Sequence, residues 1–260
     1  MIPVIDTHAH LTDASYASSL PQVLQAAVQA GLVRIGVIGF DAPTSQAACE
    51  LAARYPDLLF ASVGIQPHSA AAAAADDWSK IEQLAKHAQV RALGETGLDL
   101  YWDDTPLDVQ QDYFERHIVL SKASDLPLVI HLRDSGREIV DQLRPHSAAG
   151  PLRGVMHSFT GDLETCRACL DMGLYISFAG MVTFKKSEEL RQIAAYVPAD
   201  RVLVETDCPY LSPEPLRGKR PNEPARVVHS LAAIAKVRGV PYADLAFQTT
   251  ANAKRLFRLT

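Results

Sequence analysis

The 260-residue sequence contains few cysteines, and this limits the chemistry that thiols can supply. Cys166 and Cys169 form a C-x-x-C pair inside a helical pattern, without the second pair that a zinc knuckle needs. We therefore expect both to be inert core thiols. The full set is too small and too scattered for a disulfide scaffold, and it consists of Cys49, Cys166, Cys169 and Cys208.

Long apolar runs and a secretion signal are also lacking. A membrane-spanning helix needs roughly 20 apolar residues. The longest run of small apolar residues, Ala70 to Ala75, ends at Asp76 and Asp77. The N-terminus enters a strand-like segment at once, without a basic region, an apolar region or a cleavage site. We expect a cytoplasmic protein that does not associate with membranes.

An excess of positive charge is absent as well. The chain has 25 Lys and Arg against 30 Asp and Glu, which gives a net charge of −5. Coating long stretches of duplex depends on broad neutralisation of phosphates, so this balance argues against such a role. A short nucleic-acid end held by a metal ion stays compatible with it, and nothing in the composition implies a stable protein partner.

What the chain does have is a regular alternation of short β-branched runs and longer amphipathic stretches. This alternation is typical of parallel strands joined by crossover helices. We predict eight strands, at Val4–His8, Val33–Gly39, Leu59–Gly64, Val90–Glu95, Leu128–His131, Gly154–His157, Tyr175–Phe178 and Val202–Asp207. Helices are predicted at Leu20–Ala30, Thr44–Arg54, Trp78–His87, Leu107–Ser124 and Glu188–Tyr196.

Eight such units favour a single-domain α/β fold, a (β/α)8 TIM barrel, over residues 1–260. A doubly wound open sheet would give the same local pattern, but the strand count favours the barrel. The proline-rich segment from Pro209 to Pro224 follows the last predicted strand, where a long loop could cover a site.

Histidines and carboxylates recur at the ends of the predicted strands. His8 and His10 are separated by one residue on the first strand, so both rings point to the same side. The others end four further strands, whose carboxyl ends surround one mouth in a parallel barrel, and they are Glu95, His131, His157 and Asp207. Burying such groups without a partner is costly, so we predict that a metal cluster compensates them.

The types of ligand narrow the metal and the chemistry. Imidazole suits Zn, Mn or Fe, carboxylates also hold Mg or Mn, and a carboxylate can bridge two ions. The set has no sulfur, and a mixed His and carboxylate site with room for water is typical of catalysis. We therefore predict one or two divalent ions (Mg, Mn or Zn) that activate water, with Asp207 as the general base.

The sequence resembles the TatD-like metal-dependent hydrolases of the amidohydrolase superfamily. The resemblance runs from end to end, over Asp6–His10, Gly94–Asp99, Pro127–Arg133, His157–Gly161, Glu205–Leu211 and Asn252–Phe257. It implies a TIM barrel, a site for one or two metals and, for several members, 3′-to-5′ exonuclease activity on DNA. It also implies that His8, His10 and Asp207 hold one ion, that His131 and His157 hold the other, and that Glu95 bridges them.

The chain departs from that family after the third predicted strand. Members commonly carry His where this chain has Gln66, and Gln cannot accept a proton as imidazole can. Any acid-base or phosphate-contacting role at this position is thereby in doubt. His68 is a candidate substitute, against the alternative of a plain loop histidine.

Basic and aromatic residues near the predicted mouth are candidates for substrate contacts. Arg133 and the loop from Arg217 to Arg220 could meet a phosphate, and Tyr101 and Trp102 could stack on a nucleobase, although a solvated loop and packing are the plainer alternatives. Glu205 has the parity of Asp207 and could support the site. No chemistry is assigned to His87, His117, His146 and His229.

Three functions compete for such a site. The leading one is a nuclease or phosphodiesterase acting on DNA ends or small phosphodiesters. The second is hydrolysis of a small amide, ester or lactone, because activated water does not itself distinguish phosphorus from carbon. The third is a catalytically silent metal-binding barrel, which the complete ligand set disfavours.

Overall fold

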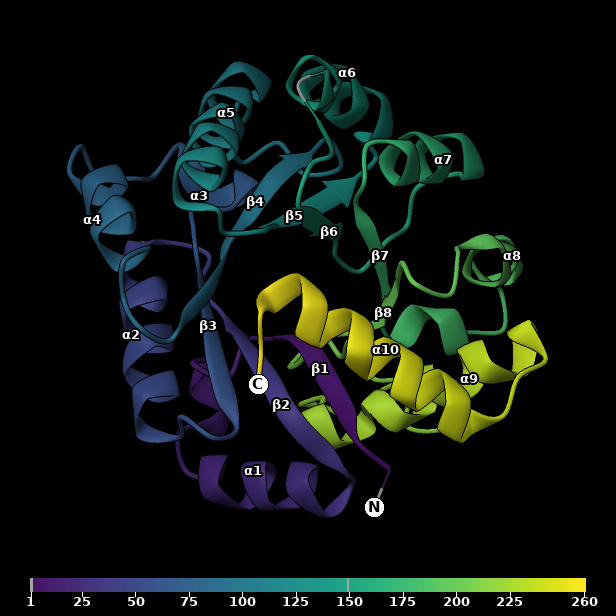
Figure 1. The fold of residues 1–260 in the computed structure, drawn as a ribbon. Coiled ribbons are helices and arrows are strands. Elements are labelled where there is room, and N and C mark those ends of the chain that lie inside the picture. Colours follow the sequence, from purple (N-terminus) through teal and green to yellow (C-terminus); the bar gives the residue numbers. More distant parts are fainter. Residues whose placement is uncertain (1, 149) are drawn as a thin grey trace.

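The computed structural model describes residues 2–148 and 150–260, and its centre is one sheet of eight parallel strands in chain order. The strands are β1 (Val4–Ala9), β2 (Leu32–Ile38), β3 (Leu59–Val63), β4 (Val90–Asp99), β5 (Leu128–Arg133), β6 (Gly154–Met156), β7 (Tyr175–Phe178) and β8 (Val202–Val204). Helices surround them on the outside (Figure 1). The predicted TIM barrel is confirmed.

The sheet closes where its first and last strands meet. Ala9 pairs with Cys208 in a parallel bridge, and the backbone N–H of His10 donates to the carbonyl of Cys208 at 2.8 Å. The N–H of Asp207 donates to the carbonyl of His8 at 2.9 Å. An open, doubly wound sheet has no such closing bonds, so that alternative is wrong.

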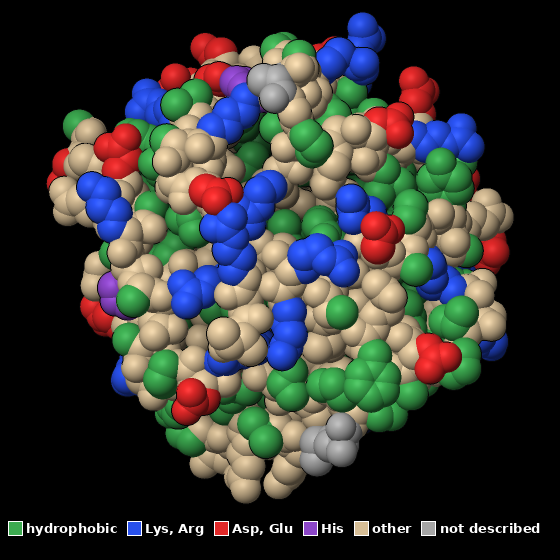
Figure 2. Space-filling view, viewed as in Figure 1, with side chains coloured by type: hydrophobic (Ala, Val, Ile, Leu, Met, Phe, Trp, Pro, Cys, Tyr) green, Lys and Arg blue, Asp and Glu red, His purple; other side chains and the backbone are tan. Residues whose placement is uncertain are grey.

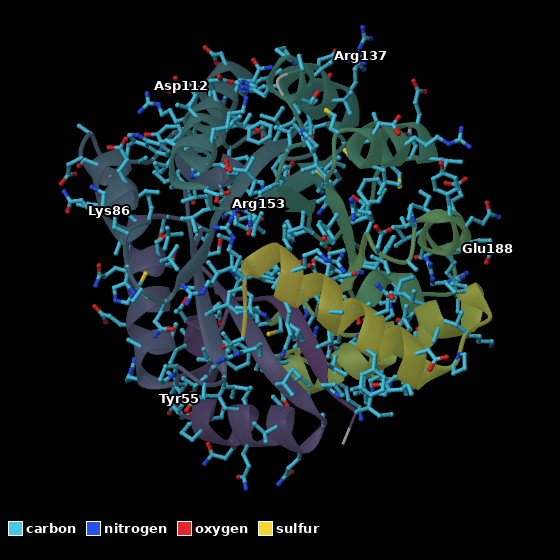
Figure 3. The ribbon with its side chains drawn as sticks, viewed as in Figure 1. Tyr55, Lys86, Asp112, Arg137, Arg153 and Glu188 are labelled. Atoms are coloured by element: carbon cyan, nitrogen blue, oxygen red, sulfur yellow. The ribbon has the colours of Figure 1, made fainter. Side chains whose placement is uncertain are left out.

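The helices follow the strands as the alternation predicted, with some shifted bounds. The longer ones are α1 (Leu20–Gln29), α2 (Ala42–Arg54), α4 (Asp77–Leu84), α5 (Leu107–Ser124), α6 (Gly136–Ser147), α7 (Leu163–Asp171), α8 (Glu188–Tyr196), α9 (Val227–Arg238) and α10 (Tyr242–Phe257). Short turns are α3 (Pro67–Ala70), η1 (Ala14–Tyr16), η2 (Gly180–Thr183) and η3 (Pro224–Arg226). In Figure 3, Arg137 and Glu188 lie on the outer sides of α6 and α8 and point away from the barrel.

Most predicted strands have shifted ends in the structure, and the shift is largest for β4 and β8. β4 runs on to Asp99, because its last four residues pair with Ile130 to Arg133 of β5. β8 ends at Val204, so Asp207 lies just beyond the strand rather than on it. In both places hydrogen bonding to a neighbouring strand decides the boundary, and the sequence pattern does not contain that information.

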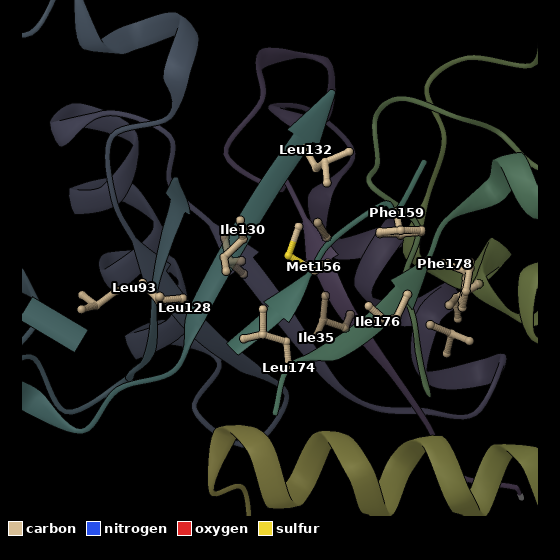
Figure 4. Close-up of a cluster of buried hydrophobic side chains, with 14 of the residues drawn as sticks. Ile35, Leu93, Leu128, Ile130, Leu132, Met156, Phe159, Leu174, Ile176 and Phe178 are labelled. Atoms are coloured by element: carbon tan, nitrogen blue, oxygen red, sulfur yellow. The ribbon is translucent and has the colours of Figure 1, made fainter. Parts of the chain in front are cut away.

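The barrel is filled and covered by apolar side chains. Its interior, at the amino ends of the strands, is packed against α10, and Phe60 of β3 lies 5.0 Å from Phe257 of α10, ring centre to ring centre. Outward-facing side chains of the strands form the larger core beneath the helices; Figure 4 shows Ile130, Met156 and Ile176 from three successive strands in this layer. The interior at the carboxyl ends is left to polar residues.

Figures 1 and 2 look onto the end of the barrel that α10 covers. Lys and Arg side chains gather over the middle of this face (Figure 2). Arg153 and Arg258 both pair with Asp125, and Arg201 pairs with Asp200. Arg153 and Arg258 thus join segments far apart in the chain, whereas Arg201 pairs with its neighbour, and we assign none of the three a ligand.

The C-x-x-C pair lies inside the hydrophobic core. Cys166 and Cys169 are buried, and burial raises the pKa of Cys166 to about 11 and that of Cys169 to about 12. Thiols with such pKa values are poor nucleophiles and poor ligands, as expected.

Among the described residues, no helix has the length and apolar character needed to cross a bilayer.

His117 of α5 is a buried histidine with a structural part in the fold. Its Nδ1 lies 2.6 Å from the carbonyl oxygen of Tyr113, and its Nε2 accepts the N–H of Ile65 at 3.2 Å. Burial lowers the pKa of His117 to about 4, so the ring is neutral in the folded protein. It ties α5 to the segment that follows β3.

This burial predicts a dependence of stability on pH. Because the unfolded chain binds a proton at His117 near pH 6.5 and the folded chain only near pH 4, stability present above pH 6.5 is lost as the pH falls. Between pH 7 and pH 5, we expect the wild type to lose about 2 kcal/mol more free energy of unfolding than His117→Asn. Urea unfolding at both pH values measures this, and equal losses would contradict it.

Candidate metal centre

The six predicted ligands converge at the carboxyl end of the barrel. His8 and His10 come from β1, Glu95 from the middle of β4, and His131 from β5. His157 follows β6 directly, and Asp207 is the third residue after β8. All six are largely buried, and their ligand atoms fall into groups that lie within 4.8 Å of one another.

Irregular pairing brings His8 and Glu95 to the inner side of the barrel. The interior residues below them are Ile5 and Ala92, and in a regular strand the side chains three positions later would point outward. β1 has one extra residue between Asp6 and Ala9 relative to β2, and β4 has one between Leu93 and Thr96 relative to β5. These bulges turn both ligands inward.

Two glycines make the bulge in β4 possible. Gly94 and Gly97 flank Glu95 and have φ angles of 132° and 125°, which L-amino acids with side chains rarely adopt. A Cβ at Gly94 would lie 2.4 Å from the carbonyl oxygen of Val129, and one at Gly97 would lie 2.2 Å from that of His131. The backbone conformation around Glu95 therefore requires glycine at both positions.

One group of ligand atoms lies on the side of β1 and β8. Nε2 of His8 and Nε2 of His10 are 3.1 Å apart. Oε2 of Glu95 lies 3.6 Å from both nitrogens. Oδ1 of Asp207 lies 3.7 Å from Nε2 of His8 and 3.5 Å from that of His10. Four donor atoms thus enclose one point.

A second group lies on the side of β5 and β6. Oε1 of Glu95 is 3.0 Å from Nδ1 of His131 and 3.1 Å from Nε2 of His157. The two imidazole nitrogens are 3.3 Å apart. Each oxygen of Glu95 therefore belongs to a different group, and this carboxylate joins them.

The spacing of these atoms fits a metal ion better than hydrogen bonds alone. Ligand atoms ~2.0–2.1 Å from a tetrahedral ion lie ~3.3–3.4 Å from one another, close to the distances found in both groups. Hydrogen bonds fit less well, because a proton on one imidazole nitrogen can serve only one of the neighbours that face it. The residues present thus suit two divalent ions with Glu95 between them.

The ionisation states of the two carboxylates are those of metal ligands. Burial acts to raise the pKa of Glu95, but the charge of His157 and hydrogen bonds from His131 and His157 outweigh it and hold the pKa well below its usual value. Burial also acts to raise the pKa of Asp207, and a hydrogen bond from His10 lowers it overall. Both carboxylates are ionised and available as ligands.

Asp207 differs from Glu95 in its access to solvent. Its side chain is 14% exposed, against 4% for Glu95, and its backbone adopts a φ of 54° in the left-handed region. Asp tolerates this conformation better than most residues, although it is still strained. The strained turn directs the carboxylate to the open side of the group formed with His8 and His10.

Further carboxylates lie near the ring nitrogens that face away from the two groups. Oδ2 of Asp99 lies 2.8 Å from Nε2 of His131, and Oε1 of Glu205 lies 3.4 Å from Nδ1 of His157. The hydrogen bond between Asp99 and His131 fixes the tautomer and orientation of that ring, whereas Nδ1 of His157 makes no hydrogen bond. The sequence predicted a supporting position for Glu205. It predicted no separate role for Asp99, which ends the Gly94–Asp99 motif.

Asp6 ties the two strands that close the barrel beneath the site. Its carboxylate accepts the N–H of Thr206 at 2.9 Å and the hydroxyl of Thr206 at 2.6 Å. It also accepts the N–H of His8 at 3.2 Å. The Asp-x-His spacing therefore anchors His8 directly to the segment that carries Asp207.

His68 has carboxylates at both ring nitrogens. Its Nε2 lies 3.1 Å from Oδ2 of Asp99, and its Nδ1 lies 3.2 Å from Oδ2 of Asp104. Gln66 is the N-cap residue just before α3, and its N–H donates to the carbonyl of Phe40 at 2.9 Å. The substrate contact expected of His68 stays a prediction, and the contacts present connect it to His131 through Asp99.

Aromatic residues lie beside His131, in the loop after β4. Oδ1 of Asp99 accepts the N–H groups of Tyr101 and Trp102 at 2.9 and 3.0 Å. Both rings are about half exposed, and the guanidinium carbon of Arg133 lies 3.9 Å from the centre of the Tyr101 ring. Tyr101, Trp102 and Arg133 therefore form one group, and the carboxylate that holds the loop also holds His131.

On the side of β8, the basic residues of the proline-rich loop are exposed. The guanidinium carbon of Arg217 lies 4.1 Å from the ring centre of Phe184. Arg220 is exposed too, and its charge acts to lower the pKa of Tyr210, which burial and the carboxylates of Asp13 and Asp207 raise. Substrate contacts by Arg217 and Arg220 stay predictions.

The four histidines to which no chemistry was assigned lie outside both ligand groups. His117 is buried in α5, and His146 lies 3.0 Å from Glu115 of that helix. His229 is in α9, and His87 follows α4. None of the four belongs to a candidate metal-binding group of the described residues.

The sharing of Glu95 predicts how variants lose metal. We expect two equivalents of Mn²⁺ or Zn²⁺ in the wild type and one in His131→Ala, because His131 belongs to no group with His8, His10 or Asp207. Glu95→Ala should weaken both sites. Equilibrium dialysis with elemental analysis measures the stoichiometry, and a wild type that binds a single ion would contradict the prediction.

The contact between Asp99 and His131 predicts a selective effect on one ion. We expect Asp99→Asn to weaken one of the two metal-binding steps roughly 10- to 100-fold and to leave the other unchanged. Isothermal titration of the metal-free protein separates the two steps. Asp141→Asn, at an exposed carboxylate of α6, is the matched control, and equal weakening of both steps by Asp99→Asn would refute the assignment.

Known proteins resemble this chain over its whole length. The model of the family described as TatD related DNase matches residues 5–258. The uncharacterized metal-dependent hydrolase YabD of Bacillus subtilis is 41% identical over 256 residues, which are 98% of this chain and 99% of the relative. A protein of Pectobacterium parmentieri named 3′-5′ ssDNA/RNA exonuclease TatD is 35% identical, with 98% of this chain and 100% of the relative covered.

A solved structure agrees with these matches. The crystal structure of YJJV, a TatD homologue from Escherichia coli K12, superposes with a TM-score of 0.92 at 28% identity and covers 99% of this chain and 98% of that one. The family match, the relatives and the groups of His, Glu and Asp side chains at the mouth agree with one another. The chain belongs to the TatD family of metal-dependent hydrolases.

Proposed function

We propose that this protein is a 3′-to-5′ exonuclease that hydrolyses phosphodiester bonds at the end of single-stranded DNA. One observation carries the proposal: the two ligand groups that share Glu95 lie beside exposed aromatic rings and Arg133. The first feature suits a phosphate and the second suits the nucleoside attached to it. The named exonuclease among the relatives supports the same substrate class.

Two divalent ions in such a site supply an activated water and neutralise charge on the scissile phosphate. His8, His10 and Asp207 would hold one ion, His131 and His157 the other, and Glu95 would bridge them. Mg, Mn and Zn all suit this set of nitrogen and oxygen donors.

We assign the proton transfer to Asp207. Its carboxylate is ionised and more exposed than that of Glu95, and Oδ1 lies 3.7 Å from Nε2 of His8 and 3.5 Å from Nε2 of His10. An attacking water positioned there would give its proton to this carboxylate. Glu95, with both oxygens enclosed by imidazoles, has the separate role of holding the two groups at a fixed spacing.

Other residues would bind and orient the DNA. Arg133 would bind a phosphate near the scissile bond, because it has the parity of His131 and lies two residues, or ~6.6 Å, further along β5. Tyr101 and Trp102 would stack on a base, and Arg217 and Arg220 would attract the chain to the rim. His68 would act through Asp99, by holding the carboxylate that orients His131.

An end-labelled assay tests this function. Metal-free protein is supplied with Mg²⁺, Mn²⁺ or Zn²⁺ and incubated with 5′-labelled single-stranded DNA, duplex DNA, and a panel of simple esters and lactones. We expect stepwise shortening from the 3′ end of the single strand, and roughly a 10²- to 10⁴-fold lower rate in Asp207→Asn, because the proton acceptor is lost.

The controls separate this function from the alternatives. Asp141→Asn should shorten DNA at the wild-type rate, and a 3′-phosphorothioate linkage should block the first step. Turnover of an ester or lactone without shortening of DNA would show that the protein is a small-molecule hydrolase and not a nuclease. Metal binding without turnover of any substrate would favour the third alternative, a metal-binding barrel without catalytic activity.

A further inference from the structure

Tyr210 is an exposed aromatic residue at the metal centre that the proposed mechanism does not use. Its side chain is 51% exposed, and its ring centre lies 6.1 Å from that of His10, with the two planes at 67°. On another side of His10, the ring of Phe40 lies 5.7 Å away. Tyr210 thus borders the ligand group that His8, His10 and Asp207 form.

The backbone of Tyr210 is held firmly although its ring is exposed. Its N–H donates to the carbonyl of Asp207 at 3.0 Å, and its own carbonyl accepts Nδ2 of Asn222 at 2.6 Å. Asn222 is fully buried, donates also to the carbonyl of Thr206 at 3.1 Å, and accepts the hydroxyl of Tyr16 at its backbone oxygen. A rigid scaffold therefore presents this ring at the mouth.

A second aromatic group borders the other ligand group. Tyr101 and Trp102 are 54% and 51% exposed, and Asp99 fixes their backbone through the same carboxylate that contacts His131. Their rings are 4.8 Å apart and nearly perpendicular. Each half of the metal centre thus has its own exposed aromatic flank, one beside His10 and one beside His131.

We propose that the two flanks bind nucleobases on opposite sides of the scissile phosphate, Tyr210 on one side and the pair of Tyr101 and Trp102 on the other. This inference rests on the proposed exonuclease function. It makes the minimal substrate a dinucleotide with a base at each position. It also assigns Tyr210 to substrate binding.

The physical argument for bases rather than sugars or phosphates is the chemistry of the flanks. A phosphate held by both ligand groups places one nucleoside toward each side of the centre. Exposed rings offer flat faces to stack on, and stacking tolerates any base because each has a π face. A base paired within a duplex is not free to leave its stack, so the two flanks would select unpaired ends.

The test combines aromatic variants with DNA that lacks a single base. Single-stranded oligonucleotides carry an abasic residue at the 3′-terminal or at the penultimate position, and the release of the first nucleotide is timed. For the wild type, either abasic residue should slow release roughly tenfold, because one stacking contact is lost. Tyr210→Ala should slow the intact oligonucleotide by a similar factor.

The decisive result is a matched loss of sensitivity. Tyr210→Ala should become insensitive to the missing base at one position and keep the wild-type sensitivity at the other. Trp102→Ala should show the opposite pattern. Tyr210→Phe, which keeps the ring, should behave as the wild type, and so should Phe247→Ala, which removes an equally exposed ring from α10 at the far end of the barrel.

Metal content and thermal unfolding of each variant exclude a damaged fold. Sensitivity of Tyr210→Ala to the missing base at both positions would overturn the inference, and so would a Tyr210→Phe variant as slow as Tyr210→Ala. Either result leaves the nuclease in place, because the wild type still shortens DNA. A wild type that neither shortens nor binds single-stranded DNA, the latter measured by fluorescence anisotropy, would overturn both proposals.

Discussion

The structure of the metal centre depends on one carboxylate that contacts both groups of ligand histidines. Glu95 presents one oxygen to the imidazoles of His8 and His10 and the other to those of His131 and His157. A carboxylate buried among four imidazole rings requires positive charge beside it. The spacing of the atoms suits divalent cations, and the shared carboxylate sets the distance between the two ligand groups.

Irregular backbone in the strands of the barrel places that carboxylate. Gly94 and Gly97 allow the backbone of β4 to turn beside β5, and the extra residue in the pairing directs Glu95 inward. β1 has a comparable irregularity before His10. These departures from a regular sheet lie at the metal centre, where bulges commonly redirect a side chain that function requires.

A layer of acidic side chains connects the metal centre to its surroundings. Asp99 contacts His131 and His68 with one oxygen and holds the loop of Tyr101 with the other. Asp6 connects His8 to Thr206. The elements that would hold a substrate are therefore linked to the ligands by direct hydrogen bonds, and this is the pre-organisation that precise chemistry needs.

The sequence by itself determined the fold class and the six candidate ligands. The alternation of strands and helices predicted a barrel, and residues at strand ends must meet at one mouth when all strands are parallel. The two-residue period also places His131 two positions above the interior residue Val129 and His157 two above Val155, as found.

Only the tertiary structure decided the rest. The same period, counted from the interior residues Ile5 and Ala92, would have turned His8 and Glu95 outward, because bulges depend on the pairing with a neighbouring strand. The parts of Asp99 and Tyr210 likewise depend on contacts between segments far apart in the chain. A local pattern records which way a residue points along its own strand, and it contains nothing about the partner across the barrel.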